Sequence, residues 1–268
     1  MDGALSRTHA APAATPRWRD AALAVPAHLR VLALGLAGIA MFGTLQVALA
    51  NGAPFGFANL DTENSLPALW SGLLLLVAAA SAVQLRRTRA RGVSILAASF
   101  LVLLFAFMGV DEVVGIHERI DGVASVDWQI WYAPLVLVGG WAWCRALLAM
   151  WRLRAGAVAF AMGAVAWVLA QTLEMFEYGG TFRPGYIDAA HLSSAELERI
   201  NSSLTYYLLM IPEELLEMTG SLLFAVGLLA GAAAVRRRRV QDAVPEMDVE
   251  LAEIHRVLVA NRPMSLSR

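Results

Sequence analysis

The sequence of 268 residues contains one cysteine and no lysine. Cys144 alone excludes an internal disulfide bond and a thiolate metal cluster. Charged residues make up only 16% of the chain, and the formal net charge of −1 leaves no basic surface for nucleic acid. Every basic residue is an arginine, a bias typical of GC-rich bacterial genomes. We therefore expect a bacterial protein with no nucleic-acid partner.

Several motifs of soluble enzymes are also missing. The chain has no glycine-rich phosphate loop, dinucleotide fingerprint or Ser–His–Asp set, which argues against a bound nucleotide and against nucleophilic hydrolysis. Paired histidines at membrane depth are absent, so no haem is expected. The pair His117-Glu118 resembles the start of a zinc-protease helix, but the second histidine of that motif is missing.

Long apolar runs are abundant, and 58% of the residues are hydrophobic. Six runs are long enough to cross the ~30 Å hydrocarbon layer of a bilayer as helices. These runs cover residues 31–50, 67–85, 93–115, 131–151, 156–178 and 204–235. No alternating pattern of a transmembrane β-barrel is present. The sequence thus predicts an all-α polytopic membrane protein, a six-transmembrane-helix bundle over residues 30–236 in the lipid bilayer.

The arginines indicate the orientation of this bundle. They gather before the first run, after the last run and in the second and fourth connections. The other connections, 51–66, 116–130 and 179–203, contain only Arg119, Arg183 and Arg199. The positive-inside rule then places the N-terminus and the C-terminus in the cytoplasm. We expect a multi-pass protein of the bacterial cytoplasmic (inner) membrane.

Both ends of the chain differ from the bundle. Residues 1–29 are rich in alanine and proline, which predicts a disordered or interfacial segment. Residues 237–268 are expected to form a cytoplasmic tail with a short amphipathic helix over 246–260, for which Pro245 is an acceptable start. Such a helix can lie on the membrane surface or bind a partner. The spacing Gly227-x-x-x-Gly231 permits close helix packing within the bundle or in a homo-oligomer.

The sixth run follows a long connection. Ser193 and Glu196 have the spacing of a capping box, which predicts a helix that continues into the sixth run. A helix from there to Val235 would be too long for the bilayer. We therefore expect a kink or a break at Pro212.

Nine acidic residues and one histidine gather at one end of the third, fifth and sixth runs. They are Asp111, Glu112, His117, Glu118, Asp121, Glu174, Glu177, Glu213, Glu214 and Glu217. In each run the acids begin 19 or 20 residues from a cytoplasmic arginine, about 30 Å along a helix, so the three groups reach one level. Ionisable groups at membrane depth are costly and mark an ion, proton or substrate site.

A rotation of 100° per residue predicts which acids face one another. In the third run, Asp111 and Glu118 lie within about 20° of each other, and His117 lies on the adjoining flank. Glu112 points roughly 100° away, toward another contact or the lipid headgroups. A break at Gly115 would change this geometry. In the fifth and sixth runs one face each carries polar residues, and we expect these two faces to converge with that of the third run.

Converging carboxylates cannot all ionise without compensation, because like charges oppose one another. Metal ions or protons must therefore neutralise some of the negative charges. Carboxylate-lined helical bundles hold dinuclear iron or manganese, and oxygen-rich sites equally suit calcium. We expect one or two divalent metal ions (iron, manganese, zinc or calcium). The expected ligands are Asp111, His117, Glu118, Glu174, Glu177, Glu213 and Glu217, and the expected supporting polar residues are Gln171, Tyr178, Tyr206, Glu214 and Ser221.

Three functions fit this pattern. The first is a membrane metalloenzyme that acts on a lipid or another apolar substrate. The second is a proton- or cation-coupled carrier, although the apolar inner halves of the runs disfavour a path across the membrane. The third is a non-catalytic membrane subunit with an acidic mouth. Taken singly, each acid is equally well explained as an interfacial residue in contact with water and headgroups.

Overall fold

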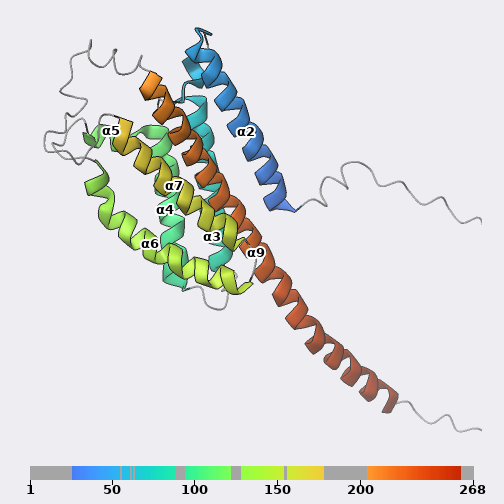
Figure 1. Cartoon of the computed structure of the whole chain (residues 1–268). Helices are drawn as coiled ribbons and strands as arrows, with labels where there is room; N and C mark the ends of the chain where they lie inside the picture. The colour runs from blue at the N-terminus through green and yellow to red at the C-terminus, as the bar shows by residue number, and fades with distance from the viewer. Residues whose placement is uncertain are drawn as a thin grey trace, which may run out of the picture.

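A computed structural model describes residues 26–54, 56–60, 62, 64–87, 94–121, 128–153, 156–177 and 204–260. Within these residues the regular structure is helical (Figure 1). The elements are α2 (Ala27–Ala50), η1 (Gly56–Ala58), α3 (Leu66–Arg87), α4 (Ile95–Val114), α5 (Ile116–Asp121), α6 (Trp128–Leu153), α7 (Ala157–Glu177) and α9 (Leu204–Ala260). Six of them are long and apolar enough to cross a membrane, which confirms the predicted all-α class and the six spans of a multi-pass membrane protein.

Helix α9 is the centre of the bundle. It packs along α7, α3 and α2, while α4 packs on α3, and α6 on α4 (Figure 1). The core between these helices is apolar, with Leu75, Leu101 and Leu228 fully buried. The rings of Phe105 and Phe224 lie 5.0 Å apart there. Large apolar side chains also cover the outside of the bundle, as expected of helices that face lipid.

Glycines allow α7 and α9 to approach closely. A Cβ atom at Gly227 would lie 2.8 Å from the backbone nitrogen of Phe160, and one at Gly220 would lie 3.0 Å from the carbonyl oxygen of Gly163. A Cβ at Gly231 would meet Met150 of α6 at 3.3 Å. Both glycines of the predicted Gly227-x-x-x-Gly231 spacing therefore pack inside one bundle.

Two predictions about α9 are wrong. The helix is continuous over 57 residues, so it has no break at Pro212, and no separate tail helix starts at Pro245. Proline removes one backbone hydrogen bond, but Met210 and Ile211 beside Pro212 pack in the apolar cluster of Phe42, Leu60 and Tyr206, which supports the helix there. The length that seemed excessive leaves the bundle as a long extension (Figure 1). The expected capping box at Ser193 and Glu196 and the segment 1–25 lie outside the described residues.

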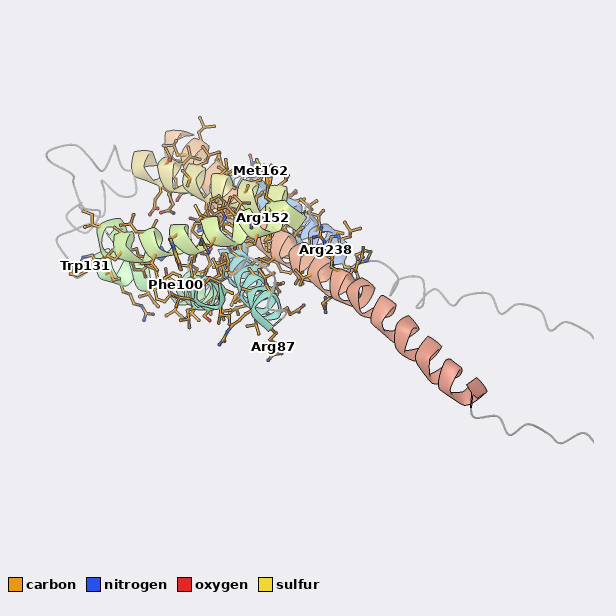
Figure 2. The ribbon with its side chains drawn as sticks, turned by 90° about the horizontal axis from the view of Figure 1, so that it is seen from below. Arg87, Phe100, Trp131, Arg152, Met162 and Arg238 are labelled. Carbon is orange, nitrogen blue, oxygen red and sulfur yellow. The ribbon has the colours of Figure 1, made fainter. Side chains whose placement is uncertain are left out.

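The two ends of the bundle differ in charge. Arg87, Arg152 and Arg238 lie at one end, which we call the arginine end, and Trp131 lies at the other (Figure 2). The acids of α4, α7 and α9 lie at the end of Trp131, which we call the acidic end. There the buried Gln46 of α2 accepts a hydrogen bond of 3.0 Å from the backbone N–H of Leu60, which fastens the connection between α2 and α3 to the bundle.

Candidate functional site

A glycine turn shapes the C-terminal end of α4. Gly115 caps α4 in the left-handed conformation, with φ +63°, and its N–H donates to the carbonyl of Asp111 at 2.7 Å. Residues with a Cβ atom adopt this conformation at a cost of about 1–2 kcal/mol, so glycine suits the position. The chain then turns at once into the short helix α5. This break separates the rotation of α5 from that of α4.

The turn brings His117 back onto Asp111. The carboxylate of Asp111 accepts a 3.0 Å hydrogen bond from the His117 backbone N–H at Oδ1, and its Oδ2 lies 3.3 Å from His117 Nδ1. Tyr132 of α6 donates its hydroxyl to the same Oδ1 at 3.3 Å. Asp111 is only 8% exposed. We call Asp111, His117 and Tyr132 the Asp111 network; it links α4, α5 and α6.

Glu112 faces the interior of the bundle. It interacts electrostatically with Asp111 and His117, and the buried Ser71 of α3 lies beside its carboxyl. Ser71 Oγ has no well-formed hydrogen bond among the described residues, so its contact with Glu112 is a weak one. Of the two alternatives predicted for Glu112, another contact or the lipid headgroups, the first is the one found, and the contact lies inside the site. Asp111 lies on the neighbouring face of α4, where it contacts Tyr132.

Glu217 of α9 is the centre of a second set. Its carboxyl interacts with the negative charges of Glu112 on α4, Glu174 on α7 and Glu214 on α9. We call these four residues the carboxylate group. Acidic side chains from the third, fifth and sixth spans therefore interact electrostatically with one another at the acidic end. Since Glu112 also interacts with Asp111 and His117, the carboxylate group and the Asp111 network form one continuous site.

Polar contacts between α7 and α9 hold Glu217 in place. Gln171 Nε2 donates to Glu217 Oε1 at 3.0 Å, and one helical turn away Trp167 Nε1 donates to Ser221 Oγ at 3.3 Å. Ser221 is fully buried. The glycine contacts of the same two helices bring these side chains within hydrogen-bonding distance. The α7–α9 interface thus positions a carboxylate with an amide and supports it with a hydrogen bond between the half-buried Trp167 and the buried Ser221.

The predicted site residues fall into three groups. Asp111, His117, Glu174, Glu214 and Glu217 belong to the site, with Gln171 and Ser221 in contact with it. Tyr206 packs with Phe42 and Leu60 in an apolar cluster, and Glu213 is buried in the first turns of α9. The side chains of Glu118 and Glu177, and Tyr178, lie outside the described residues.

Sequence reasoning missed Glu112, Tyr132 and Ser71 as members of the site. Tyr132 reads as one more residue of an aromatic belt, and Ser71 as a small residue in an apolar helix. Their roles depend on which faces of α3 and α6 turn toward α4. Among the described side chains, no three histidine, cysteine or acidic residues lie close enough together to hold a metal ion. The metal ligands expected from the sequence remain a prediction.

The comparisons with known proteins give one match. A family model described as "Domain of unknown function (DUF8692)" matches residues 27–232, which include five complete spans, most of the sixth and the whole described site. No curated protein and no solved structure matches the chain. The matched segment starts at the first residue of α2 and ends inside α9, before the arginines of that helix. On this match the chain belongs to the DUF8692 family.

Proposed function

We propose that the protein is a membrane metalloprotein that binds a divalent metal ion at its acidic end and uses it on a lipid or another apolar substrate. The single observation that carries this proposal is the interaction of Glu217 with three other carboxyls, from three helices, at one place. Burying like charges together is costly unless a cation or protons neutralise them.

The chemistry of the side chains suits a metal. Carboxylate oxygens are ligands for calcium, manganese and iron, and a bundle of helices can present them from several sides. In the Asp111 network, His117 can donate a hydrogen bond from Nδ1–H to Oδ2 of Asp111, and in that tautomer Nε2 is the nitrogen that would bind a metal. A carboxylate behind a histidine fixes the orientation of the ring in many metal sites.

The apolar core supports an enzyme over a carrier. Between the site and the arginine end the helices are joined by buried leucine, alanine and phenylalanine side chains, such as Leu75, Leu101 and Phe105. A carrier needs polar groups along its path, and the buried polar atoms described on this side of the site are few: Ser81 Oγ, which donates to the carbonyl of Val77, and Gln84 Oε1. A site that opens on one side of the membrane suits a reaction on a substrate that arrives through the lipid.

The arginines support the orientation. Exposed arginines end α3, α6 and the last span of α9 at the same end of the bundle (Figure 2). By the positive-inside rule this end faces the cytoplasm, which places both termini there and the acidic end outside. We assign the protein to a bacterial inner membrane on the same argument. The extension of α9 then lies in the cytoplasm, where it offers a helix for a partner or a second copy of the chain.

A proton site is the second candidate. The contact of Gln171 with Glu217 satisfies one carboxyl oxygen without a cation, and the described side chains hold no ready-made cluster of three ligands. Protons on some of the four carboxyls would remove the repulsion as well as a metal would. A membrane subunit that moves protons at its outer face is the function that follows from this candidate.

Elemental analysis distinguishes the two. The full chain is purified without added metal, and metal per chain is measured before and after treatment with a chelator. We expect one or two equivalents of a divalent metal in the wild type, and a loss of most of it in Glu217→Gln. Glu250→Gln, in the extension of α9 beyond the bundle, is the matched control and should keep the metal. Natively folded wild type without metal above background would contradict the metal site and leave the proton site.

A further inference from the structure

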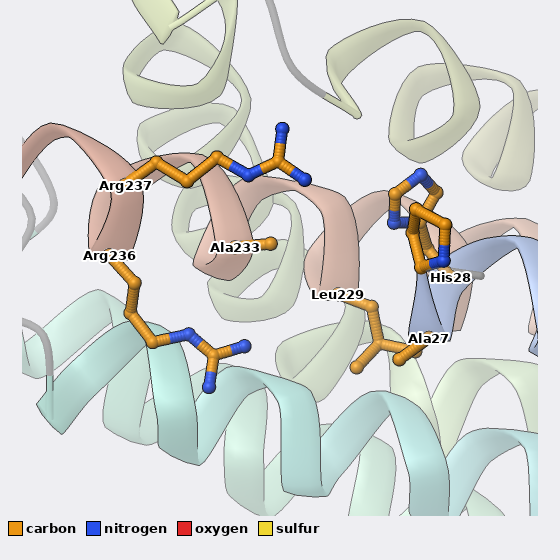
Figure 3. A pocket seen from close by; sticks show the side chains of 7 residues that line it. Ala27, His28, Leu229, Ala233, Arg236 and Arg237 are labelled. Atoms are coloured by element: carbon orange, nitrogen blue, oxygen red, sulfur yellow. The ribbon is translucent and has the colours of Figure 1, made fainter. Parts of the chain in front are cut away.

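A small pocket lies at the arginine end, far from the acidic site. It has a volume of about 270 Å³ and lies between the first turn of α2 and the end of the last span of α9 (Figure 3). It is lined by Pro26, Ala27, His28, Leu229, Ala233, Arg236 and Arg237. The spans of α2 and α9 both reach their arginine-side ends here. The pocket is therefore at the level where lipid headgroups meet the protein.

The pocket has three sources of positive charge. Arg236 and Arg237 extend their guanidinium groups from α9 on the side of the pocket (Figure 3). Both are exposed, and among the side chains that the structure describes no carboxylate forms a salt bridge with either. The third source is the N-terminus of α2, which begins at Pro26 without a side-chain cap. The N–H groups of Leu29 and Arg30 donate to the carbonyl of Pro26, and the positive end of the dipole of α2 lies beside the pocket.

The remaining wall of the pocket is apolar. Ala233 and Leu229 lie one and two turns before the arginines on the same face of α9. An anion of a salt or a nucleotide gains nothing from this wall. A phospholipid gains from both parts, because its phosphate contacts the guanidinium groups while the start of its acyl chains lies along Leu229 and Ala233.

We propose that this pocket binds the headgroup of an anionic phospholipid in the leaflet at the arginine end. Basic pockets between transmembrane helices on the cytoplasmic side are suited to such headgroups. The lipid would join the ends of α2 and α9, and α2 has few contacts with the bundle other than those with α9. This inference is independent of the proposed metal site, and Arg236 and Arg237 lie outside the segment that the family model matches.

The test measures lipid binding to the full chain in detergent, by native mass spectrometry with phosphatidylglycerol and with phosphatidylcholine. We expect one phosphatidylglycerol to bind the wild type at least tenfold more tightly than phosphatidylcholine. The variant Arg236→Gln/Arg237→Gln should lose about thirtyfold in affinity, as expected for two arginines near an anionic lipid surface. The matched control Arg86→Gln/Arg87→Gln removes two exposed arginines of the same end that do not line the pocket, and it should bind as the wild type does.

A third variant tests the pocket without changing its charge. Ala233→Leu fills the pocket beside the arginines, and it should weaken phosphatidylglycerol binding while leaving metal content unchanged. Equal losses in the two arginine double variants would overturn the proposal, because they would show diffuse attraction to a basic end. Full competition by millimolar inorganic phosphate would overturn it too, because the site would then bind phosphate without a lipid. Unchanged binding in both Ala233→Leu and Arg236→Gln/Arg237→Gln would place the lipid elsewhere.

Discussion

The two ends of this bundle carry opposite charges and use them in opposite ways. At the acidic end the carboxyls lie between helices, with Asp111 and Glu213 buried. At the arginine end the charged side chains lie on the outside, and Arg87 and Arg238 are exposed to their surroundings. Exposed arginines are solvated and orient the protein in its membrane. Carboxyls that interact with one another are costly unless a cation or protons neutralise them, and our proposal of a ligand at the acidic end rests on this cost.

The largest effect should come from the apolar contact between α7 and α9, where the free energy of unfolding depends on close packing of the two backbones. Gly227→Leu forces a side chain into the backbone of α7 at Phe160, and we expect a loss of about 3 kcal/mol, the upper part of the range for overpacked cores. Thermal unfolding of the purified protein measures it. Gly140→Leu is the control, because a Cβ there meets nothing within 4 Å. Equal stability of the two variants would show that α7 and α9 do not pack as described.

Removal of metal by a chelator should produce the next largest loss of stability, and this loss should depend on the carboxyls of the acidic end. A ligand present at a hundred times its dissociation constant stabilises a protein by about 2.7 kcal/mol, so a chelator should lower the melting temperature of the wild type. Glu112→Gln removes one carboxyl that faces Glu217, and the melting temperature of this variant should respond much less to the chelator. An equal response in Glu112→Gln would place the metal away from the carboxylate group.

Substitution of two glutamines, one near each end of the bundle, should give a smaller difference in the free energy of unfolding. Gln46→Leu leaves the buried N–H of Leu60 without its acceptor, and we expect a loss of about 1–2 kcal/mol in the free energy of unfolding. Gln84→Leu, toward the arginine end of α3, removes a carbonyl oxygen that has no hydrogen bond among the described residues, and it should be neutral or stabilising. Chemical denaturation of both variants tests the pair, and a larger loss in Gln84→Leu would reverse the contrast.

The smallest effect concerns the Asp111 network. Tyr132→Phe removes the hydroxyl that donates to Asp111 and keeps the ring that packs edge-on against Phe107 at 5.5 Å. We expect a loss of about 1 kcal/mol. Tyr207→Phe on α9 is the control, because the hydroxyl of Tyr207 has no hydrogen bond among the described residues, and this variant should unfold as the wild type does. A loss in Tyr207→Phe that matched Tyr132→Phe would point to the phenol rings in general.

Much of the fold follows from the sequence because membrane length is a strong constraint. An apolar run must be near 20 residues to span the bilayer, so the predicted spans agree with the helices to within a few residues at most ends. Proline was a weaker guide. Pro212 and Pro245 lie inside α9, since contacts with neighbouring helices outweigh a single lost hydrogen bond at Pro212. For Pro245, in the extension, we have no physical account of the unbroken helix.

The level of the site was predicted, and so was the facing of the fifth and sixth spans, where Gln171 and Glu217 contact each other, but the facing of the third span was not. Counting residues from the arginines put the acids of three spans at one depth, and Glu217 does interact electrostatically with Glu112 and Glu174 there. The rotation assigned to the third span assumed a helix that continues through Gly115. The left-handed turn at Gly115 moves His117 onto Asp111 and leaves Glu112 to face Glu217. Only a three-dimensional structure gives the direction of a chain after such a turn.

The affinity for the bound divalent metal in Glu174→Gln, in Glu217→Gln and in the double variant tests most directly whether carboxyls of different helices share one ion. If they share it, each single variant weakens binding at least tenfold, and the double variant weakens it by less than the product of the two losses. Losses that multiply fully, or single variants that bind as tightly as the wild type, would contradict a shared site.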